Sequence, residues 1–356
     1  MQTRNLNPQV FFDRLSQQHS PKHAFGGRTK QQFRSWKRTA LPKVLSTLGT
    51  MPPKVRPRPQ LVAQWEQDGL IKQRWLIDTQ PGLSASLLLY RPAGLKRGQR
   101  RPAILCCHGH GPHGKHSVMG VAPTPDQQAT VKLFNYDYGL QMAKAGFVTY
   151  AIDWLGFGER DSRKPPHFHR GIETRDPCNV HFLCATMLGT TVLALNCHDG
   201  SAATDFVCSQ PFVDAARLGV MGLSFGGTMA TWMALADERF RAANIICYGG
   251  PFHAMSFESY NTCGSQMTPG LYDLVDMADL QGLIAPRPLL FEVGVHDTCF
   301  HVDAVMGRHW PQLEKIYKAA GAAETLELDL HPNEHGWGGN KSVAFFGRHL
   351  GLKHRA

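Results

Sequence analysis

A serine flanked by glycines stands between an apolar run and a helix-like stretch. Ser224 lies two residues after Gly222 and two before Gly226, directly behind the apolar residues 218–221. In a tight strand-to-helix turn the hydroxyl of such a serine is exposed, and the glycines let the strand and the helix approach each other. The N-terminus of the following helix, residues 228–235, would present free N–H groups to negative charge beside the serine. The pattern predicts a serine nucleophile; the alternative is an ordinary Gly/Ser turn.

A serine hydroxyl needs a neighbouring base, and that base needs an orienting carboxylate. Asp297 follows the apolar run 288–293, and His335 follows the run 325–330. The order Ser, Asp, His along the chain is one of the orders in which catalytic triads occur. We therefore predict that Ser224, Asp297 and His335 are catalytic. Other residues nearby compete for the acid and base roles: Asp303, His296, His301, His309 and His331.

A loop rich in histidine and glycine, residues 108–112, follows the apolar run 103–107. Acyl transfer needs backbone N–H donors for the developing oxyanion, and we expect them from His110 or Gly111 together with Phe225. Imidazole is also a common zinc ligand, so a metal site is the alternative. Because no carboxylate or thiolate lies near these histidines in the sequence, we predict no metal. The histidines concerned are His108, His110, His113 and His116.

Three further residues at the ends of apolar runs are candidates for the pocket wall. Asp153 and Trp154 follow the run 147–152, and Trp337 lies two residues after His335. The charged residues of the segment 153–160 could instead form a structural ion pair, which is the interpretation that we favour for them.

Apolar runs of strand length recur along the chain, separated by stretches long enough for helices. Two early runs, 75–78 and 87–90, flank a Pro-Gly turn and predict antiparallel strands. The later runs predict a mostly parallel sheet of the α/β class with helices on both faces. The segments 162–205 and 253–280 lie between the strands and could form either a lid or helices packed on the sheet. The later runs are 103–107, 147–152, 218–221, 243–247, 288–293 and 325–330.

The net charge of +10 is located at the N-terminus: residues 1–60 contain twelve Lys and Arg and one acidic residue, Asp13. The proline-rich connector 51–59 divides this basic segment from a main domain over residues 61–356. Aromatic and aliphatic residues in the segment suggest a helical extension that packs on the main domain or on a second subunit, so a homo-oligomer stays open. A transit peptide and a tail that binds an anionic surface or a nucleic acid are the alternatives, and we expect no specific nucleic-acid binding.

Nine cysteines, an odd number, lie mostly in apolar surroundings and resemble buried residues of a reducing compartment. Cys299 is the one that we expect close to the site. The N-terminus lacks a secretory signal, and no apolar run approaches the roughly 20 residues that a membrane span requires. These features lead to the expectation of a cytoplasmic protein.

The chain resembles the α/β-hydrolases, in the branch of dienelactone hydrolases and acetyl-xylan-esterase-like enzymes, over about residues 70–356. The resemblance is carried by residues 107–111, 153–158 and 222–227, with Asp297 and His335. It implies a serine nucleophile, no cofactor and a small-molecule ester substrate, although dienelactone hydrolases proper have cysteine where this chain has Ser224. We expect a carboxylic-ester hydrolase that forms an acyl-enzyme and acts on small esters, acylated carbohydrates among them. The alternatives are a serine peptidase of the prolyl-oligopeptidase type and a non-catalytic binding protein with a basic tail.

Overall fold

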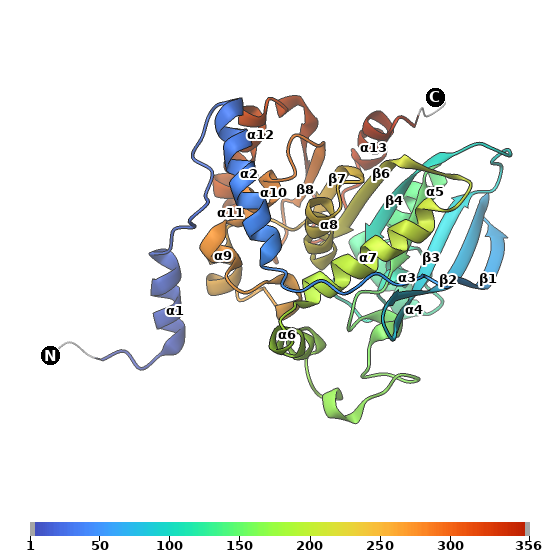
Figure 1. The fold of residues 1–356 in the computed structure, drawn as a ribbon, viewed down its shortest axis with the longest axis horizontal. Helices are drawn as coiled ribbons and strands as arrows, with labels where there is room; N and C mark the ends of the chain where they lie inside the picture. The colour runs from blue at the N-terminus through green and yellow to red at the C-terminus, as the bar shows by residue number, and fades with distance from the viewer. Residues whose placement is uncertain (1–3, 353–356) are drawn as a thin grey trace.

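A nine-stranded mixed sheet forms the centre of the computed structural model, which describes residues 4–352 (Figure 1). The strand order is β1-β2-β3-β5-β4-β6-β7-β8-β9. Strands β4 to β9 are parallel, whereas β1, β2 and β3 are antiparallel at one edge. The strands are β1 (Gln60–Gln67), β2 (Leu70–Gln80), β3 (Leu83–Pro92), β4 (Arg101–Cys107), β5 (Val148–Ile152), β6 (Val213–Leu223), β7 (Phe240–Ile246), β8 (Leu289–Gly294) and β9 (Leu326–His331).

The sheet confirms the predicted fold class, with one strand that the sequence pattern did not indicate. Strand β1 is exposed at almost every position because it is an edge strand whose two faces are largely uncovered. It therefore has neither the continuous apolar run nor the alternation that identifies a strand in a sequence.

Helices cover both faces of the sheet, and each face has its own buried core. On one face α7, α8 and α12 contribute to the core, and α2 packs against α8 and α12; on the other face lie α3, α5 and α13. The helices are α1 (Pro8–Gln17), α2 (Lys30–Ser46), α3 (Lys115–Val118), α4 (Pro125–Phe134), α5 (Tyr138–Lys144), α6 (Pro177–Met187), α7 (Val192–Cys208), α8 (Phe225–Ala236), α9 (Leu271–Leu274), α10 (Met277–Gly282), α11 (Val302–Ala304), α12 (Trp310–Ala320) and α13 (Ser342–Leu350). Within residues 4–352, no helix combines the length and the apolar character needed to cross a bilayer.

The basic N-terminal segment contains the helices α1 and α2. Helix α2 begins with a capping box formed by Thr29 and Gln32, and it buries Phe33 and Val44 in the core of the face that α8 covers. Its positive side chains thus lie on a helix that is anchored by apolar contacts. Helix α1 lies at the margin of the fold, at the left of Figure 1, and of its residues only Ser16 is buried.

Candidate active site

Ser224 stands at the turn between β6 and α8 with backbone angles φ 61° and ψ −121°. Residues other than glycine rarely adopt such a conformation, and it persists only where the surroundings impose it. The neighbouring glycines are required by space: a Cβ atom at Gly222 would lie 2.2 Å from the carbonyl oxygen of Gly226, and one at Gly226 would lie 2.1 Å from that of Cys107. The strand, turn and helix predicted around this serine are therefore present, with the strand packed directly against the helix.

Ser224 opens onto a cavity of about 580 Å³, and His335 lies in the wall of the same cavity. None of the lining residues in the described part of the chain is Asp, Glu, Lys or Arg. The cavity is thus suited to uncharged groups. Its lining consists of Gly109, His110, Gly111, Pro112, His113, Gly114, Ser117, Thr130, Phe134, Tyr136, Leu223, Ser224, Tyr260, Asn261, Thr262, Cys263, Gln266, Cys299 and His335.

The carboxylate of Asp297 holds the imidazole of His335. Nδ1 of His335 donates to Oδ2 of Asp297 at 2.9 Å, while Oδ1 accepts from the backbone N–H groups of Cys299 at 2.7 Å and Phe300 at 2.9 Å. Burial by itself would raise the pKa of Asp297, but the hydrogen bond and positive charge from His335 and the two N–H donors lower it below its usual value. Asp297 is therefore ionised at neutral pH and fixes the orientation of the ring.

Ser224 and His335 share the cavity, but among the hydrogen bonds of residues 4–352 none joins the Ser224 hydroxyl to the His335 ring. Hydrogen bonds of this kind are often long in a site without substrate and shorten when substrate binds. Cys299, the cysteine expected near the site, also lines the cavity.

The competing acid and bases lie elsewhere. His309 is buried and is held by the N–H of Gly250 and by Gln281. His331 is buried, and neither of its ring nitrogens has a hydrogen-bond partner within residues 4–352. Asp303 lies on α11, and neither it nor the exposed His296 and His301 lines the cavity.

The loop after β4 runs directly beside the serine. A Cβ atom at Gly109 would lie 2.8 Å from the carbonyl oxygen of Leu223 and 3.4 Å from Cβ of Ser224. The N–H of Gly109 donates to the hydroxyl of Tyr136 at 2.6 Å, and the N–H groups of His110 and Phe225 have no acceptor among the described residues. Free N–H groups thus lie on the loop and at the start of α8, the two elements that meet at the serine.

The side chain of His108 holds this loop through hydrogen bonds at both of its ring nitrogens. Its Nδ1 donates to the carbonyl oxygen of Gly109 at 2.8 Å, and its Nε2 accepts from the backbone N–H of Trp154 at 3.0 Å. Burial lowers the pKa of His108 to about 4, so the ring is neutral and each nitrogen has one partner. Both nitrogens are therefore occupied, which leaves none free to bind a metal.

Three residues that the sequence suggested as lining of the pocket lie outside the cavity. Their predicted position in the pocket wall is therefore corrected. Asp153 is buried and pairs with Nζ of Lys115 at 2.6 Å, in agreement with the structural ion pair that was the favoured interpretation of this charged segment. Trp154 and Trp337 are buried in the two cores. None of the three is among the residues that line the cavity.

A buried carboxyl group that the sequence analysis missed supports the loop of His335. Oε1 of Glu292 accepts from Asn244 at 2.6 Å, Ser342 at 2.6 Å and Trp337 at 3.2 Å, and its Oε2 accepts from the N–H of Gly339 at 3.2 Å. Burial raises the pKa of Glu292, and the hydrogen bonds oppose that rise. A glutamate inside an apolar strand run was the one signal that could have identified it.

The four histidines near the loop after β4 do not gather into one group. Among the described residues, the candidate metal-binding clusters contain only His110 of the four, and it lies with Cys178 and Cys263. The neighbouring Cys263 thiol and the His110 ring lower the pKa of Cys178 to about 5, against the effect of burial. No local sequence pattern connects these cysteines with the loop, because 153 residues separate His110 from Cys263.

A sequence model of the Abhydrolase family matches residues 3–240, and a model of the prolyl oligopeptidase family matches residues 195–303. The protein named "Putative hydrolase YtaP" of Bacillus subtilis (strain 168) is 25% identical over 229 residues, which are 64% of this chain and 70% of that protein.

Solved structures share the fold at low sequence identity. A "putative acetyl xylan esterase" of Bacteroides fragilis NCTC 9343 has a TM-score of 0.71 and 18% identity, over 92% of this chain and 83% of that one. A glucuronoyl esterase from Solibacter usitatus has a TM-score of 0.64 and 16% identity, over 88% of this chain and 92% of that one. With the family match over residues 3–240, the chain belongs to the Abhydrolase family and has the α/β-hydrolase fold predicted from its motifs.

Proposed function

We propose that the chain is a serine hydrolase of neutral carboxylic esters. One observation carries the proposal: Ser224 and His335 open onto the same cavity. The serine is strained in the turn between β6 and α8, and the histidine is held by the buried carboxylate of Asp297. In this proposal Ser224 is the nucleophile, His335 the base and Asp297 the group that orients the base.

The hydrogen-bond pattern supports these roles. Because Nδ1 of His335 donates to Asp297, the neutral imidazole keeps Nε2 as the proton acceptor. The Ser224 oxygen attacks the ester carbonyl carbon while its proton passes to Nε2, and the same proton then goes to the leaving alcohol as the acyl–oxygen bond breaks. Water repeats the sequence on the acyl-enzyme, so that the acid is released and Ser224 regains its proton.

The oxyanion formed in each step needs donors on the side away from the base. The free N–H of Phe225 and that of His110 or Gly111 are the donors that we propose. The closeness of Gly109 to Leu223 and Ser224 supports the choice, since the loop approaches the serine without an intervening side chain.

The substrate class follows from the lining of the cavity. A buried charge needs a partner, and none of the cavity residues of the described chain is Asp, Glu, Lys or Arg. This composition favours a small uncharged acyl group, such as acetyl, over a peptide held by a charged terminus. The names of the structural relatives, acetyl xylan esterase and glucuronoyl esterase, agree with an ester on a carbohydrate.

A peptidase is the second candidate, because the prolyl oligopeptidase model matches a segment that contains both Ser224 and Asp297. Rates on p-nitrophenyl acetate, butyrate and octanoate, on acetylated sugars and on a peptide p-nitroanilide separate the two. We expect the short esters to be hydrolysed and the anilide to be inert. Faster cleavage of the anilide would favour the peptidase, and no turnover of any substrate would favour a binding protein.

A further inference from the structure

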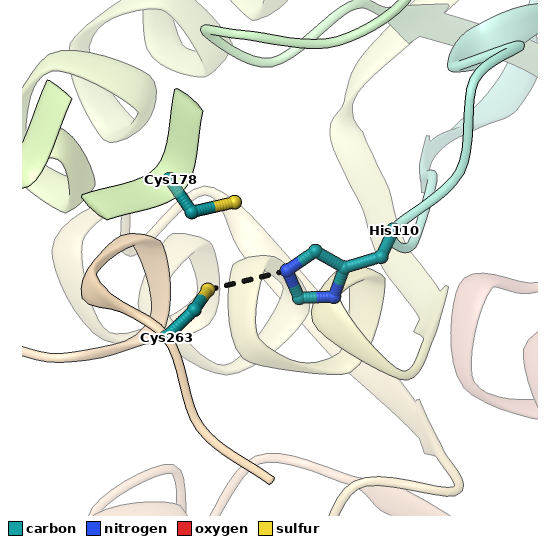
Figure 2. A group of neighbouring side chains, drawn as sticks. All are labelled: His110, Cys178 and Cys263. Carbon is teal, nitrogen blue, oxygen red and sulfur yellow. Dashed lines mark hydrogen bonds between the residues drawn. The ribbon is translucent and has the colours of Figure 1, made fainter. Parts of the chain in front are cut away.

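Three side chains from distant segments meet beside the cavity and have no role in the proposed ester chemistry. His110 lies on the loop after β4, Cys178 in the first turn of α6, and Cys263 directly before the short 3-10 turn Gly264–Gln266. Nε2 of His110 lies 3.2 Å from Sγ of Cys263, and the three ligand atoms all lie within 4.8 Å of one another. Figure 2 shows the imidazole ring and both sulfur atoms pointing toward one another.

Aromatic packing holds the imidazole in this direction. The ring of His110 contacts Phe225, with centroids 4.9 Å apart, and Phe157, at 5.5 Å, and these two rings also contact each other, at 5.4 Å. Because these ring contacts restrict the orientation of the imidazole, it loses less freedom when one of its nitrogens binds a ligand than an unpacked ring would.

The two cysteines are held by the packing of their turns. Asp176 caps α6 by accepting from the backbone N–H of Cys178, and the N–H of Gly264 donates to Oδ1 of Asn179 at 2.9 Å. A Cβ atom at Gly264 would lie 2.3 Å from Cβ of Phe182, so the turn after Cys263 rests directly on α6. These contacts fix the backbones of Cys178 and Cys263 relative to each other, so that only side-chain rotation changes the separation of the two sulfur atoms.

We propose that His110, Cys178 and Cys263 bind a zinc-type metal ion. Two thiolates and one imidazole form a soft donor set that suits zinc and does not suit magnesium or calcium, which require oxygen ligands. Bonds of about 2.0 to 2.3 Å around a tetrahedral ion place the donor atoms roughly 3.5 Å apart, which small side-chain rotations can reach from the observed spacing. Two thiolate charges would also balance the charge of a divalent ion.

The position of the ion follows from the burial of its ligands. Cys178 is 5% exposed, Cys263 is half-buried and His110 is exposed, and the last two also line the cavity. An ion can thus enter from the cavity side. Once bound, it would join the loop of His110 to α6 and to the turn after Cys263, and so fix one wall of the cavity. The metal site does not depend on the role proposed for Ser224.

The test uses the full-length chain, reduced and freed of metal by a chelator. It is incubated with Zn²⁺, separated from free metal by gel filtration and analysed for bound zinc; Co²⁺ in place of Zn²⁺ reports thiolate ligands by charge-transfer absorption. We expect one ion per chain in the wild type and a more than about tenfold loss of affinity in Cys178→Ser, Cys263→Ser and His110→Gln. Cys184→Ser, at an exposed cysteine of the same helix, should bind like the wild type.

Two further variants separate this site from the candidate active site. His335→Ala removes a ligand of the other cluster, Cys247, Asp297 and His335, and should keep its zinc. Ser224→Ala should lose ester hydrolysis and keep its zinc, so either proposal can fail without the other.

Peptide mapping keeps the test valid if a ligand variant does not fold. In the wild type, Zn²⁺ should protect Cys178 and Cys263 from alkylation and leave Cys184 reactive. The assignment would be overturned if the wild type retained no zinc, if both cysteine variants retained it, or if His335→Ala lost it. A Cys178–Cys263 disulfide would also overturn the assignment if the reduced protein takes up no zinc, because the disulfide would then identify the two cysteines as a redox couple.

Discussion

Nδ1 of His335 donates a hydrogen bond to Oδ2 of Asp297 across a separation of 38 residues in the chain. The contact exists because β8 and β9 are parallel neighbours, with Gly294 paired to His331, so that the loops after both strands leave the sheet at the same edge. The same edge receives the turn of Ser224. One sheet thus supplies the nucleophile, the base and the acid of the proposed ester hydrolase.

Ser224→Ala should lower kcat for a short p-nitrophenyl ester by about 10³-fold or more, because only oxyanion and binding effects would remain. The melting temperature should change little, since the Ser224 hydroxyl is not a hydrogen-bonding partner of His335 in the structure. A fluorophosphonate should label the wild type at Ser224. Labelling of a different serine would contradict the assignment.

Asp297→Asn should reduce kcat by about 10²- to 10⁴-fold, because the amide cannot hold the His335 ring in the required tautomer. Asp303→Asn is the matched control: this residue lies on α11 outside the cavity, and its replacement should leave kcat within about twofold. Steady-state kinetics on one ester decide between the two carboxylates, and the reverse pattern would transfer the acid role to Asp303.

Gly226→Ala should destabilise the protein by about 1 to 3 kcal/mol or prevent folding, because its Cβ would lie 2.1 Å from the backbone oxygen of Cys107. Gly307→Ala is the control, since a Cβ there has no heavy atom within 4 Å. Urea unfolding measures both free energies. Equal stability of the two variants would show that the turn of Ser224 tolerates a wider separation of strand and helix.

The buried His108 predicts loss of stability in mild acid. Its pKa is about 4 in the folded protein and about 6.5 in an unfolded chain, so between these values the unfolded chain binds a proton that the folded chain does not. The free energy of unfolding should therefore fall as the pH decreases from about 6.5 to about 4, by about 3 kcal/mol from this group. His309, whose pKa burial lowers to about 3, acts in the same direction.

Urea unfolding at several pH values measures this slope. Replacing the exposed His167 by Gln should leave the slope unchanged, whereas His108→Gln should reduce it. A free energy of unfolding that stays constant between about pH 6.5 and about pH 4.5 would contradict the prediction.

Phe33→Ala should cost about 3 to 5 kcal/mol, because this side chain of α2 is 4% exposed and belongs to the main core. Phe12→Ala, at a residue of α1 that is 49% exposed, should stay within about 0.5 kcal/mol of the wild type. Chemical denaturation of both variants distinguishes a packed N-terminal segment from a detachable basic tail. If Phe33→Ala were also neutral, the segment would contribute no stability.

The sequence by itself determined the features that depend on neighbouring residues. Short runs rich in apolar residues identified the strands β2 to β9, and the glycines around Ser224 predicted the turn, because burial of a strand and a close approach of backbone both restrict the residues locally. The chain order of Ser224, Asp297 and His335 then indicated which strand ends to compare.

Only the tertiary structure decided which distant residues meet. The two thiols beside His110 come from α6 and from the segment after β7, and no local pattern links them to the loop after β4. Likewise the carboxylate of Asp153 pairs with Lys115 and does not line the cavity, because a buried carboxylate is stabilised by a nearby cation. Contacts of this kind depend on the packing of several segments at once, which residue type and spacing along the chain do not specify.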